Sequence, residues 1–498
     1  MPSSAVRVAV CVVALGLASR TAAAQKNAAA APVRTWDEKP IVLPLAGSGV
    51  AYVPRTPTPR VVLFISGDGG WNAGVADMAR RIAAEQAIVI GVSYPALKRG
   101  SARQGGCWYV ASDLELISHA AQKTLKLPQY HAPVLVGYSS GASLVYAALA
   151  NTPAVTFAGG MSLGFCPNLA SREVCSGDGW TPDYDEQKHV NRLPATKELP
   201  KDWYILQGAQ DQVCPVDTMR RFTAGVPKAH FLEVEGTGHG FSKDVHWGPP
   251  FDKALQDLWT EKDVKPPAAQ PKSATARELE DELQRLLLPL EYRWPAQISS
   301  LLLFFSGDGG GASLDEATSE ELVTRGVGVI GVSSLRYFWN TKTPAQVASD
   351  IKRLVAALAR SRHPIFAGGF SFGAEIVPVA LREWPAADRQ MLAGLVMVGP
   401  GLSASFEIDP LDWVRTPVEN PETRVASAVR AIGLPALCLA GTDEEDTPCP
   451  SLSGAPGVHV VRLPGSHHFN GDYTAVAEAV YQFIRTASST ASTAERRP

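Results

Sequence analysis

The chain has 498 residues, too many for one ordinary hydrophobic core, so its length predicts two or three domains. Hydrophobic residues make up 45% of the chain and charged residues 19%, and the formal net charge is −3, as in ordinary globular proteins. Without a basic excess, this composition argues against a nucleic-acid partner. After the N-terminus no stretch reaches the 18 apolar residues of a membrane span.

The first 24 residues have the pattern of a secretory signal peptide. Arg7 precedes a short apolar run, Val8–Ala18, and small residues follow up to Ala22–Ala24. A charged start, a short apolar core and an A-x-A cleavage site are typical of such peptides. Cys11 lies inside the apolar run, which argues against a lipoprotein anchor. We therefore expect residues 1–24 to be removed and the mature protein to be periplasmic.

Residues 35–260 form the first expected domain, in which short apolar segments alternate with helical patterns. The expected strands are Arg60–Ser66, Ile88–Val92, Pro133–Gly137, Phe157–Leu163, Trp203–Gly208 and His230–Val234. The expected helices are Val75–Glu85, Val110–Leu125 and Ala142–Leu149. This alternation predicts the α/β class, with a mostly parallel sheet covered by helices on both faces.

A linker and a second domain follow. Residues 261–276 are rich in Lys, Pro and Ala, as linkers are, and Arg277–Leu288 then has helical spacing that would suit packing at the domain boundary. The second domain, 277–488, has expected strands at Leu301–Ser306, Gly328–Val332, Pro364–Gly368, Gly394–Val398, Ala436–Ala440 and Val458–Leu463. Because Ser, Thr and Ala dominate the end of the chain, we expect 489–498 to be a disordered tail.

The second domain repeats the motifs of the first in the same order. The matched pairs are Phe64–Trp71 with Phe304–Gly311, Val89–Ser93 with Val329–Ser333, and Gly137–Ala142 with Gly369–Ala374. Three motifs in matching order indicate a duplicated domain.

The cysteines favour an oxidising compartment. Six of the seven follow the signal peptide: Cys107, Cys166, Cys175 and Cys214 in the first domain, and Cys438 and Cys449 in the second. Even numbers in each domain are typical of disulfides, although buried free thiols remain an alternative. Cys438–Cys449 is the single pairing open within the second domain, while the first allows three connectivities.

Each copy contains a G-x-S-x-G motif between an expected strand and an expected helix, at Ser139 and at Ser371. This context is typical of the nucleophile elbow of α/β-hydrolases, so we predict two tandem α/β-hydrolase domains. The backbone N–H groups of Ser140 and Phe372 would start the helix behind each serine and contact an oxyanion. A plain Gly-Ser turn is the simpler alternative.

A serine nucleophile needs a base and an orienting carboxylate, in the chain order Ser, Asp, His for this fold. In the first domain Asp211 follows the strand that ends at Gly208, and His239 follows the last strand. Both lie at carboxyl ends of strands, where open α/β sheets place their sites. We therefore predict Ser139, Asp211 and His239 as the first catalytic set.

The acid of the second set is ambiguous. Counting from Gly441 favours Glu444, whereas counting back from Cys449 favours Asp446, because Asp211 lies three residues before Cys214. We choose Asp446 and keep Glu444 as the alternative.

The base of the second set has two candidates, which are adjacent in the sequence. Alignment with the first copy selects His467, and His468 is the alternative. The predicted second set is therefore Ser371, Asp446 and His467.

The repeated Ser-Gly-Asp-Gly-Gly loop follows the first core strand of each copy and would donate the second oxyanion N–H. We place this donor and the substrate contacts at Gly67 and Asp68 in the first copy and at Gly307 and Asp308 in the second. An Asp at this place would suit a substrate ammonium, although a turn-forming Asp is the more common case. Ser334–Trp339 follows a strand of the second domain and would line an acyl pocket or belong to the core.

No zinc, dinucleotide or P-loop pattern occurs, so we expect neither a metal nor a cofactor. At the motifs Ser306–Gly310, Ser334–Trp339, Gly369–Gly373 and Gly465–Phe469 the chain resembles the AcvB/VirJ family of periplasmic virulence factors of Gram-negative bacteria. The resemblance covers nearly all of the mature chain, and some members correspond to its second half alone. Gly311 departs from the pattern, since the first copy has Trp71 there.

The resemblance implies hydrolysis of aminoacyl-phosphatidylglycerol, mainly the lysyl form, with Ser371 as the nucleophile. It also implies an aminoacyl phospholipid as the substrate and peripheral contact with the inner-membrane surface. The alternatives are a hydrolase of another exported ester and a non-enzymatic secretion or virulence partner on a hydrolase fold.

Overall fold

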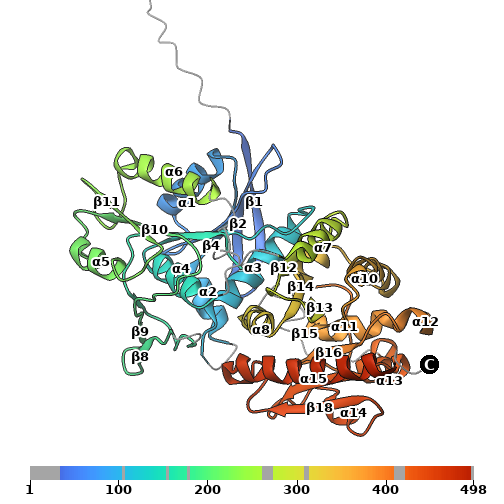
Figure 1. Ribbon diagram of the computed structural model, residues 1–498. Coiled ribbons are helices and arrows are strands. Elements are labelled where there is room, and N and C mark those ends of the chain that lie inside the picture. Colours follow the sequence, from blue (N-terminus) through green and yellow to red (C-terminus); the bar gives the residue numbers. More distant parts are fainter. Residues whose placement is uncertain are drawn as a thin grey trace, which may run out of the picture.

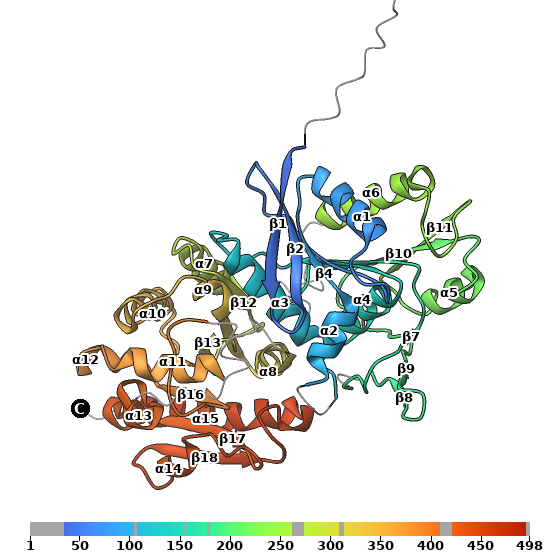
Figure 2. The same ribbon diagram turned by 180° about the vertical axis from the view of Figure 1, so that it is seen from behind.

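The computed structural model describes residues 34–103, 107–152, 156–176, 180–260, 273–307, 313–408 and 421–494. Within these ranges the chain forms two α/β units, each a mostly parallel sheet with helices on both faces (Figures 1 and 2). The predicted signal peptide and most of the predicted linker lie outside the described residues. Among the described residues, no helix combines the length and the apolar character needed to cross a membrane.

The first unit is built on an eight-stranded sheet in the order β1-β2-β4-β3-β5-β6-β10-β11. Its strands are β1 (Trp36–Leu43), β2 (Gly47–Pro54), β3 (Val61–Ile65), β4 (Ile88–Val92), β5 (Val134–Tyr138), β6 (Gly159–Leu163), β10 (Trp203–Gly208) and β11 (Ala229–Val234). The strands from β4 to β11 run parallel, and their apolar, β-branched runs agree with burial on both faces. The antiparallel hairpin β1–β2 extends one edge and was not predicted.

Two layers of helices cover this sheet. The helices of the first unit are α1 (Ala73–Ala84), α2 (Tyr94–Ser101), α3 (Val110–Thr124), α4 (Ser140–Ala150), α5 (Val216–Thr223) and α6 (Asp244–Thr260). Apolar residues of α1 and α6 form the core on one face, and those of α2 to α5 form the core on the other. Between β6 and β10 the chain makes a small antiparallel sheet from β7 (Asn168–Leu169), β8 (Asp183–Asp185) and β9 (Val190–Arg192).

The second unit repeats this plan with seven strands in the order β12-β14-β13-β15-β16-β17-β18. The strands are β12 (Leu290–Arg293), β13 (Ser300–Phe305), β14 (Val327–Val332), β15 (Ile365–Phe370), β16 (Gly394–Val398), β17 (Ala436–Gly441) and β18 (Val458–Leu463). A single antiparallel strand, β12, replaces the hairpin of the first unit. The matching strand order confirms the duplicated α/β architecture.

The helices of the second unit also form two layers. They are α7 (Ala274–Gln284), α8 (Ser313–Thr324), α9 (Ser334–Tyr337), α10 (Pro344–Leu358), α11 (Phe372–Leu381), α12 (Ala386–Arg389), α13 (Val425–Ile432), α14 (Cys449–Leu452) and α15 (Tyr473–Ala494), with short 3-10 turns at Ala359–Ser361, Pro421–Thr423 and Phe469–Gly471. Helices α8 and α15 cover one face, while α7, α9, α10, α11 and α13 cover the other.

The predicted disordered tail, 489–498, is wrong as far as Ala494, because α15 continues to that residue. Alanine is the best helix former, so a segment rich in it prolongs a helix already packed on the sheet. Residues 495–498 lie outside the described part of the chain.

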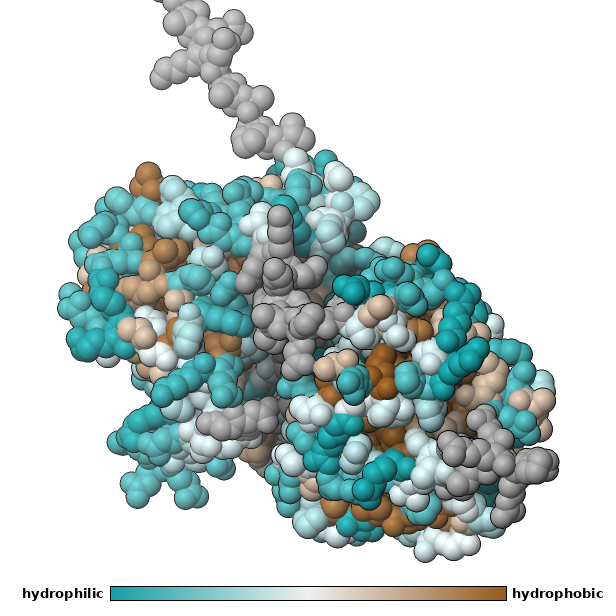
Figure 3. Space-filling view, in the orientation of Figure 1, coloured by the Kyte–Doolittle hydropathy of each residue, from teal (hydrophilic) through white to brown (hydrophobic). Residues whose placement is uncertain are grey.

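The described residues contain three disulfides. The predicted Cys438–Cys449 pair is confirmed, and the first unit pairs Cys107 with Cys175 and Cys166 with Cys214. The face drawn in Figure 3 is largely hydrophilic, and its hydrophobic residues form separate spots.

Candidate active site

Ser139 and Ser371 lie in sharp turns between a strand and a helix. Ser139 follows β5 with φ 56° and ψ −121°, and Ser371 follows β15 with φ 51° and ψ −119°. A positive φ combined with a ψ near −120° is a sparsely populated conformation for a residue other than glycine, and it costs about 1–3 kcal/mol. A Cβ at Gly141 would lie 2.4 Å from the Ile65 carbonyl oxygen, and one at Gly373 would lie 2.1 Å from that of Phe305. The glycine two residues after each serine is therefore required by the close approach of the neighbouring strand.

In the first unit the structure brings the three predicted side chains together. The Ser139 Oγ and His239 Nε2 are 3.0 Å apart, and the His239 Nδ1 and Asp211 Oδ2 are 2.8 Å apart. These are hydrogen-bond distances, and the order of contacts from serine to imidazole to carboxylate is that of a catalytic triad.

The carboxylate of Asp211 is fully buried and fixed by several donors. Its Oδ1 accepts the N–H groups of Val213 and Cys214 at 2.9 Å each, and its Oδ2 accepts Gln207 Nε2 at 2.9 Å. Gln207 was missed in the sequence, because a single Gln inside a strand gives no signal of its own. These bonds hold the acid in place toward His239.

In the second unit Glu444, and not Asp446, contacts the imidazole. The Ser371 Oγ is 2.9 Å from His467 Nε2, and His467 Nδ1 is 2.6 Å from Glu444 Oε1. Glu444 Oε2 also accepts the N–H of Gly441 at 3.2 Å. The prediction of Asp446 as the acid is therefore wrong, since this residue is exposed to solvent.

The error has a geometric reason. The acid follows directly after its strand, so its place is set by the end of that strand: Asp211 is three residues after Gly208 and Glu444 is three residues after Gly441. In the second domain the acid is five residues before the cysteine, whereas in the first it is three residues before. Counting back three residues from Cys449 therefore selected Asp446 in place of Glu444. A glutamate is also longer by one methylene, yet it still reaches the imidazole.

As predicted, the histidine that contacts the Ser371 hydroxyl is His467, and His468 lies beside it. The ring of Phe370 contacts both, with centroid distances of 5.0 Å to His467 and 5.8 Å to His468. Burial lowers the pKa of His468, and the neighbouring His467 lowers it further. His468 is therefore neutral at physiological pH.

Two glycines contact the imidazoles and were missed in the sequence. Gly164 follows β6 with φ +63°, and a Cβ there would lie 3.2 Å from the His239 ring; Gly399 follows β16 with φ +56°, and a Cβ there would lie 3.1 Å from the His467 ring. Both positions combine the left-handed conformation with a tight contact, so glycine is needed. Their equivalent place after matched strands was the signal that could have found them.

In the loop beside the first serine, Gly67 lies next to Ser139 and the Asp68 side chain is paired. A Cβ at Gly67 would lie 3.0 Å from Ser139 Cβ, so the main chain of this loop passes next to the nucleophile. The Ser140 hydroxyl donates a hydrogen bond to the Asp68 carboxylate. In the second unit a Cβ at Gly307 would lie 3.8 Å from the Cβ of Ser371, so this loop also passes beside the nucleophile. Asp308 lies outside the described residues.

The helix that follows Ser371 begins with a buried aromatic residue. Phe372 begins α11 and is buried, and its ring contacts that of Phe338 edge to face at 5.0 Å. Phe338 belongs to the predicted Ser334–Trp339 segment, which starts where the Ser334 N–H donates to Ser306 Oγ at 3.0 Å. Phe372 is at the first helical position, where backbone N–H groups lack an acceptor within the helix and are open to an oxyanion.

A family comparison agrees with the duplication. The model of the bacterial virulence protein family VirJ matches residues 59–246 and again 299–488, more than half of the chain. The chain belongs to the VirJ family. No curated protein matches its sequence.

Three solved structures to which this VirJ-family protein is similar are each about the size of one unit. Est1E from Butyrivibrio proteoclasticus has 18% identity over 40% of this chain and 93% of its own, with a TM-score of 0.29. An esterase domain from Rhodothermus marinus has 14% identity over 45% and 97%, with a TM-score of 0.30. An α/β serine hydrolase without a lid from Xanthomonas campestris has 17% identity over 46% and 96%, also with 0.30.

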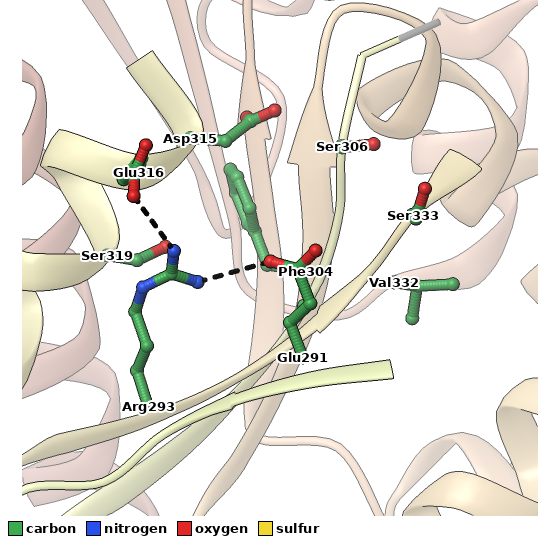
Figure 4. Close-up of a pocket in the computed structure, with 10 residues that line it drawn as sticks. Glu291, Arg293, Phe304, Ser306, Asp315, Glu316, Ser319, Val332 and Ser333 are labelled. Carbon is green, nitrogen blue, oxygen red and sulfur yellow. Dashed lines mark ion pairs between the residues drawn. The ribbon is translucent and has the colours of Figure 1, made fainter. Parts of the chain in front are cut away.

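The replacement of Trp71 by Gly311 coincides with a polar cavity in the second unit of the VirJ-family protein. In the first unit the Trp71 ring packs on Phe64 at 5.7 Å and lies against Gly91 of β4. The equivalent Phe304 and Gly331 line a cavity of about 30 Å³ in the second unit (Figure 4). Gly311 itself lies outside the described residues, and a glycine has no side chain to occupy this space.

Charged groups line this cavity. Arg293 forms ion pairs with Glu291 at 3.6 Å and with Glu316 at 3.7 Å, and Asp315 lies on the same helix as Glu316 (Figure 4). Burial raises the pKa of Glu316, and Arg293 partly opposes this effect. With three carboxylates and one guanidinium, the lining carries an excess of negative charge. Among the described residues no cluster of His, Cys, Asp and Glu is arranged to hold a metal ion.

Proposed function

We propose that the protein is a periplasmic serine esterase that releases the amino acid from aminoacyl-phosphatidylglycerol, chiefly the lysyl form, and that Ser371 is the nucleophile. The observation that carries the proposal is the relay of contacts in the second unit, 2.9 Å from Ser371 Oγ to His467 Nε2 and 2.6 Å from His467 Nδ1 to Glu444. Such a relay activates a serine for attack on an ester carbonyl.

The reaction takes place in two steps. The Ser371 Oγ attacks the aminoacyl carbonyl carbon while His467 accepts the hydroxyl proton, and Glu444 stabilises the imidazolium that forms. The N–H of Phe372, together with the loop that begins at Gly307, binds the oxyanion. Phosphatidylglycerol then leaves as the alcohol with the proton from His467, and water, activated by the same imidazole, frees the amino acid.

Three features support this substrate class. The amino acid of these lipids is attached by an ester, the bond that a Ser-His-carboxylate set cleaves. Membership of the VirJ family agrees with the resemblance that implied an aminoacyl phospholipid as the substrate. The cavity at the carboxyl ends of β13 and β14 opens at the sheet edge where β15 leads to Ser371, and the negative charge of its lining would favour a cationic amino acid over a neutral one.

The three disulfides and membership of the VirJ family support export to the periplasm, where cysteines are oxidised. Such a location places the protein beside the outer leaflet of the inner membrane, with which we propose peripheral contact.

Release of free lysine from lysyl-phosphatidylglycerol in mixed micelles tests the proposal, with purified wild type, Ser139→Ala, Ser371→Ala and the double variant. We expect lysine release to be lost with Ser371→Ala and retained with Ser139→Ala, at unchanged thermal stability. Alanyl-phosphatidylglycerol is the matched neutral substrate and should be cleaved more slowly. Lysine release in the double variant, or none in the wild type alongside cleavage of a soluble ester, would exclude this substrate assignment.

A further inference from the structure

We propose that the first domain positions the active site of the second through Trp339, which inserts into a socket of the first domain. The socket consists of Lys123, Leu127 and Tyr130, from the end of α3 and the segment after it. This inference rests on the proposed function, because it concerns the reactivity of Ser371. In Figures 1 and 2 α3 lies against the second unit, next to α7.

The indole ring, its N–H and the carbonyl oxygen of Trp339 all contact the socket. Its indole N–H donates to the Leu127 carbonyl oxygen at 2.9 Å, and its own carbonyl oxygen accepts a hydrogen bond from the Lys123 ammonium. The Lys123 nitrogen lies 4.6 Å from the centre of the indole ring, and the Tyr130 ring lies 5.5 Å away. Trp339 is 4% exposed, so this contact is a buried, hydrogen-bonded anchor and not a surface touch.

The socket is also part of the core of the second domain. Tyr130 is buried in the same apolar cluster as Leu279 and Leu283 of α7, and Leu127 packs against that cluster. The helical pattern expected at the boundary thus packs against both domains. Separation of the domains would expose this cluster, so the two units form one continuous core at this place.

Trp339 is connected to the site by its neighbour. Phe338 is fully buried and contacts the ring of Phe372, whose N–H is the expected oxyanion donor. The other end of the segment is fixed by two hydrogen bonds between Ser334 and Ser306, which precedes Gly307 in the second oxyanion loop. The segment from Ser334 to Trp339 therefore spans from the oxyanion loop to the first domain, and its pose depends on both ends.

In the described part of the first copy, the matching segment is bound within its own domain. Tyr94 donates its N–H to Ser66 Oγ at 3.0 Å, as Ser334 does to Ser306, but its hydroxyl group donates to Ala170 within the same domain. The support from the other domain is thus specific to the second site. Because an error of about 1 Å in the placement of a reacting group costs on the order of 100-fold in rate, loss of the anchor should slow the chemical step.

The test uses the full chain carrying Ser139→Ala and a fluorophosphonate, which reacts only with an activated serine. Ser371 Oγ forms the bond to phosphorus, fluoride leaves, and His467 takes the hydroxyl proton. We compare Trp339→Phe, Trp339→Ala and Lys123→Met with Trp384→Phe as the matched control. Trp384 is also 4% exposed and donates its indole N–H to a main-chain carbonyl, that of Ala348 at 2.8 Å, inside the second domain.

We expect the maximal labelling rate to fall at least tenfold with Trp339→Ala, by less with Trp339→Phe and Lys123→Met, and by less than twofold with Trp384→Phe, at unchanged initial binding of the probe. Labelling within twofold of the parent for all Trp339 and Lys123 variants would overturn the inference. An equal loss in Trp339→Phe and Trp384→Phe would overturn it as well, because the effect would then come from general loss of stability. A parent that is not labelled at all would refute the proposed function and the inference with it.

Discussion

The acid of the second site gives the sharpest prediction. Two carboxylates lie in the same loop, and only Glu444 contacts the imidazole, so replacing Glu444 and replacing Asp446 should have different effects. Glu444→Gln removes the charge that faces the imidazole while keeping the shape and the contact with Gly441. A pair of unit charges about 4 Å apart contributes about 4 kcal/mol at an effective dielectric constant of 20. Since 1.36 kcal/mol corresponds to a factor of ten, this is about 10³-fold in rate. The Glu444 side chain is 11% exposed and that of His467 37%, so water weakens the effect, and we expect a loss between about 10² and 10³.

The assay is hydrolysis of a soluble ester by the full chain in the Ser139→Ala background, so that only the second site acts. Asp446→Asn is the matched control, since it removes one charge from the same loop, and we expect less than about a twofold change. Thermal unfolding checks that both variants fold. A loss with Asp446→Asn as large as that with Glu444→Gln, or an unchanged rate with Glu444→Gln, would refute the assignment.

Three further predictions concern packing, pH and the disulfide. A methyl group on Gly67 would lie 3.0 Å from Ser139 Cβ, whereas one on Gly307 would lie 3.8 Å from Ser371 Cβ. Gly67→Ala should therefore slow fluorophosphonate labelling of Ser139 roughly tenfold, and Gly307→Ala should slow labelling of Ser371 much less. Equal effects of the two substitutions would contradict this prediction. Burial, and to a smaller degree Lys123, lowers the pKa of His119 to about 3. Below about pH 6.5 this imidazole therefore binds a proton in the unfolded chain but stays neutral in the folded protein. Its contribution to stability is complete above that pH and falls by about 2 kcal/mol at pH 5; in urea unfolding His119→Phe should show a shallower loss between pH 7.5 and 5, and the same loss as in the wild type would count against it. Replacing Cys438 and Cys449, separated by 11 in sequence, with alanine should cost about 3 kcal/mol in the free energy of unfolding, and an unchanged melting temperature would argue against this.

The sequence predicted the strands well because each is a short, continuous apolar run. Ile88–Val92, Trp203–Gly208 and Gly394–Val398 match their strands residue for residue, since strands buried on both faces have strong hydrophobic signals. The hairpin β1–β2 was missed because it lies at the edge of the sheet, where half-exposed residues weaken the pattern. The end of α15 was missed for a different reason: the polar composition of this segment was given more weight than the helix propensity of its alanines.

For the site, the sequence could predict the residues that follow fixed strand ends but not those defined by loop length. Ser139, Asp211 and His239 come together as expected, whereas the second acid depended on where extra residues entered the loop before Cys449. Trp339 illustrates a second limit. An aromatic residue after a strand could have been a pocket wall or a core residue, and it is instead held by the other domain, a contact between positions more than 200 residues apart.

The central claim is that Ser371 carries the amino acid during turnover, and direct detection of this ester tests it. Wild type and Ser371→Ala are mixed with lysyl-phosphatidylglycerol, quenched in acid within the first turnover, and digested for mass spectrometry. The account predicts a lysyl ester on the peptide that contains Ser371 in the wild type and none in the variant. Lysine release without any lysyl ester on Ser371, or a lysyl ester on Ser139 alone, would contradict it.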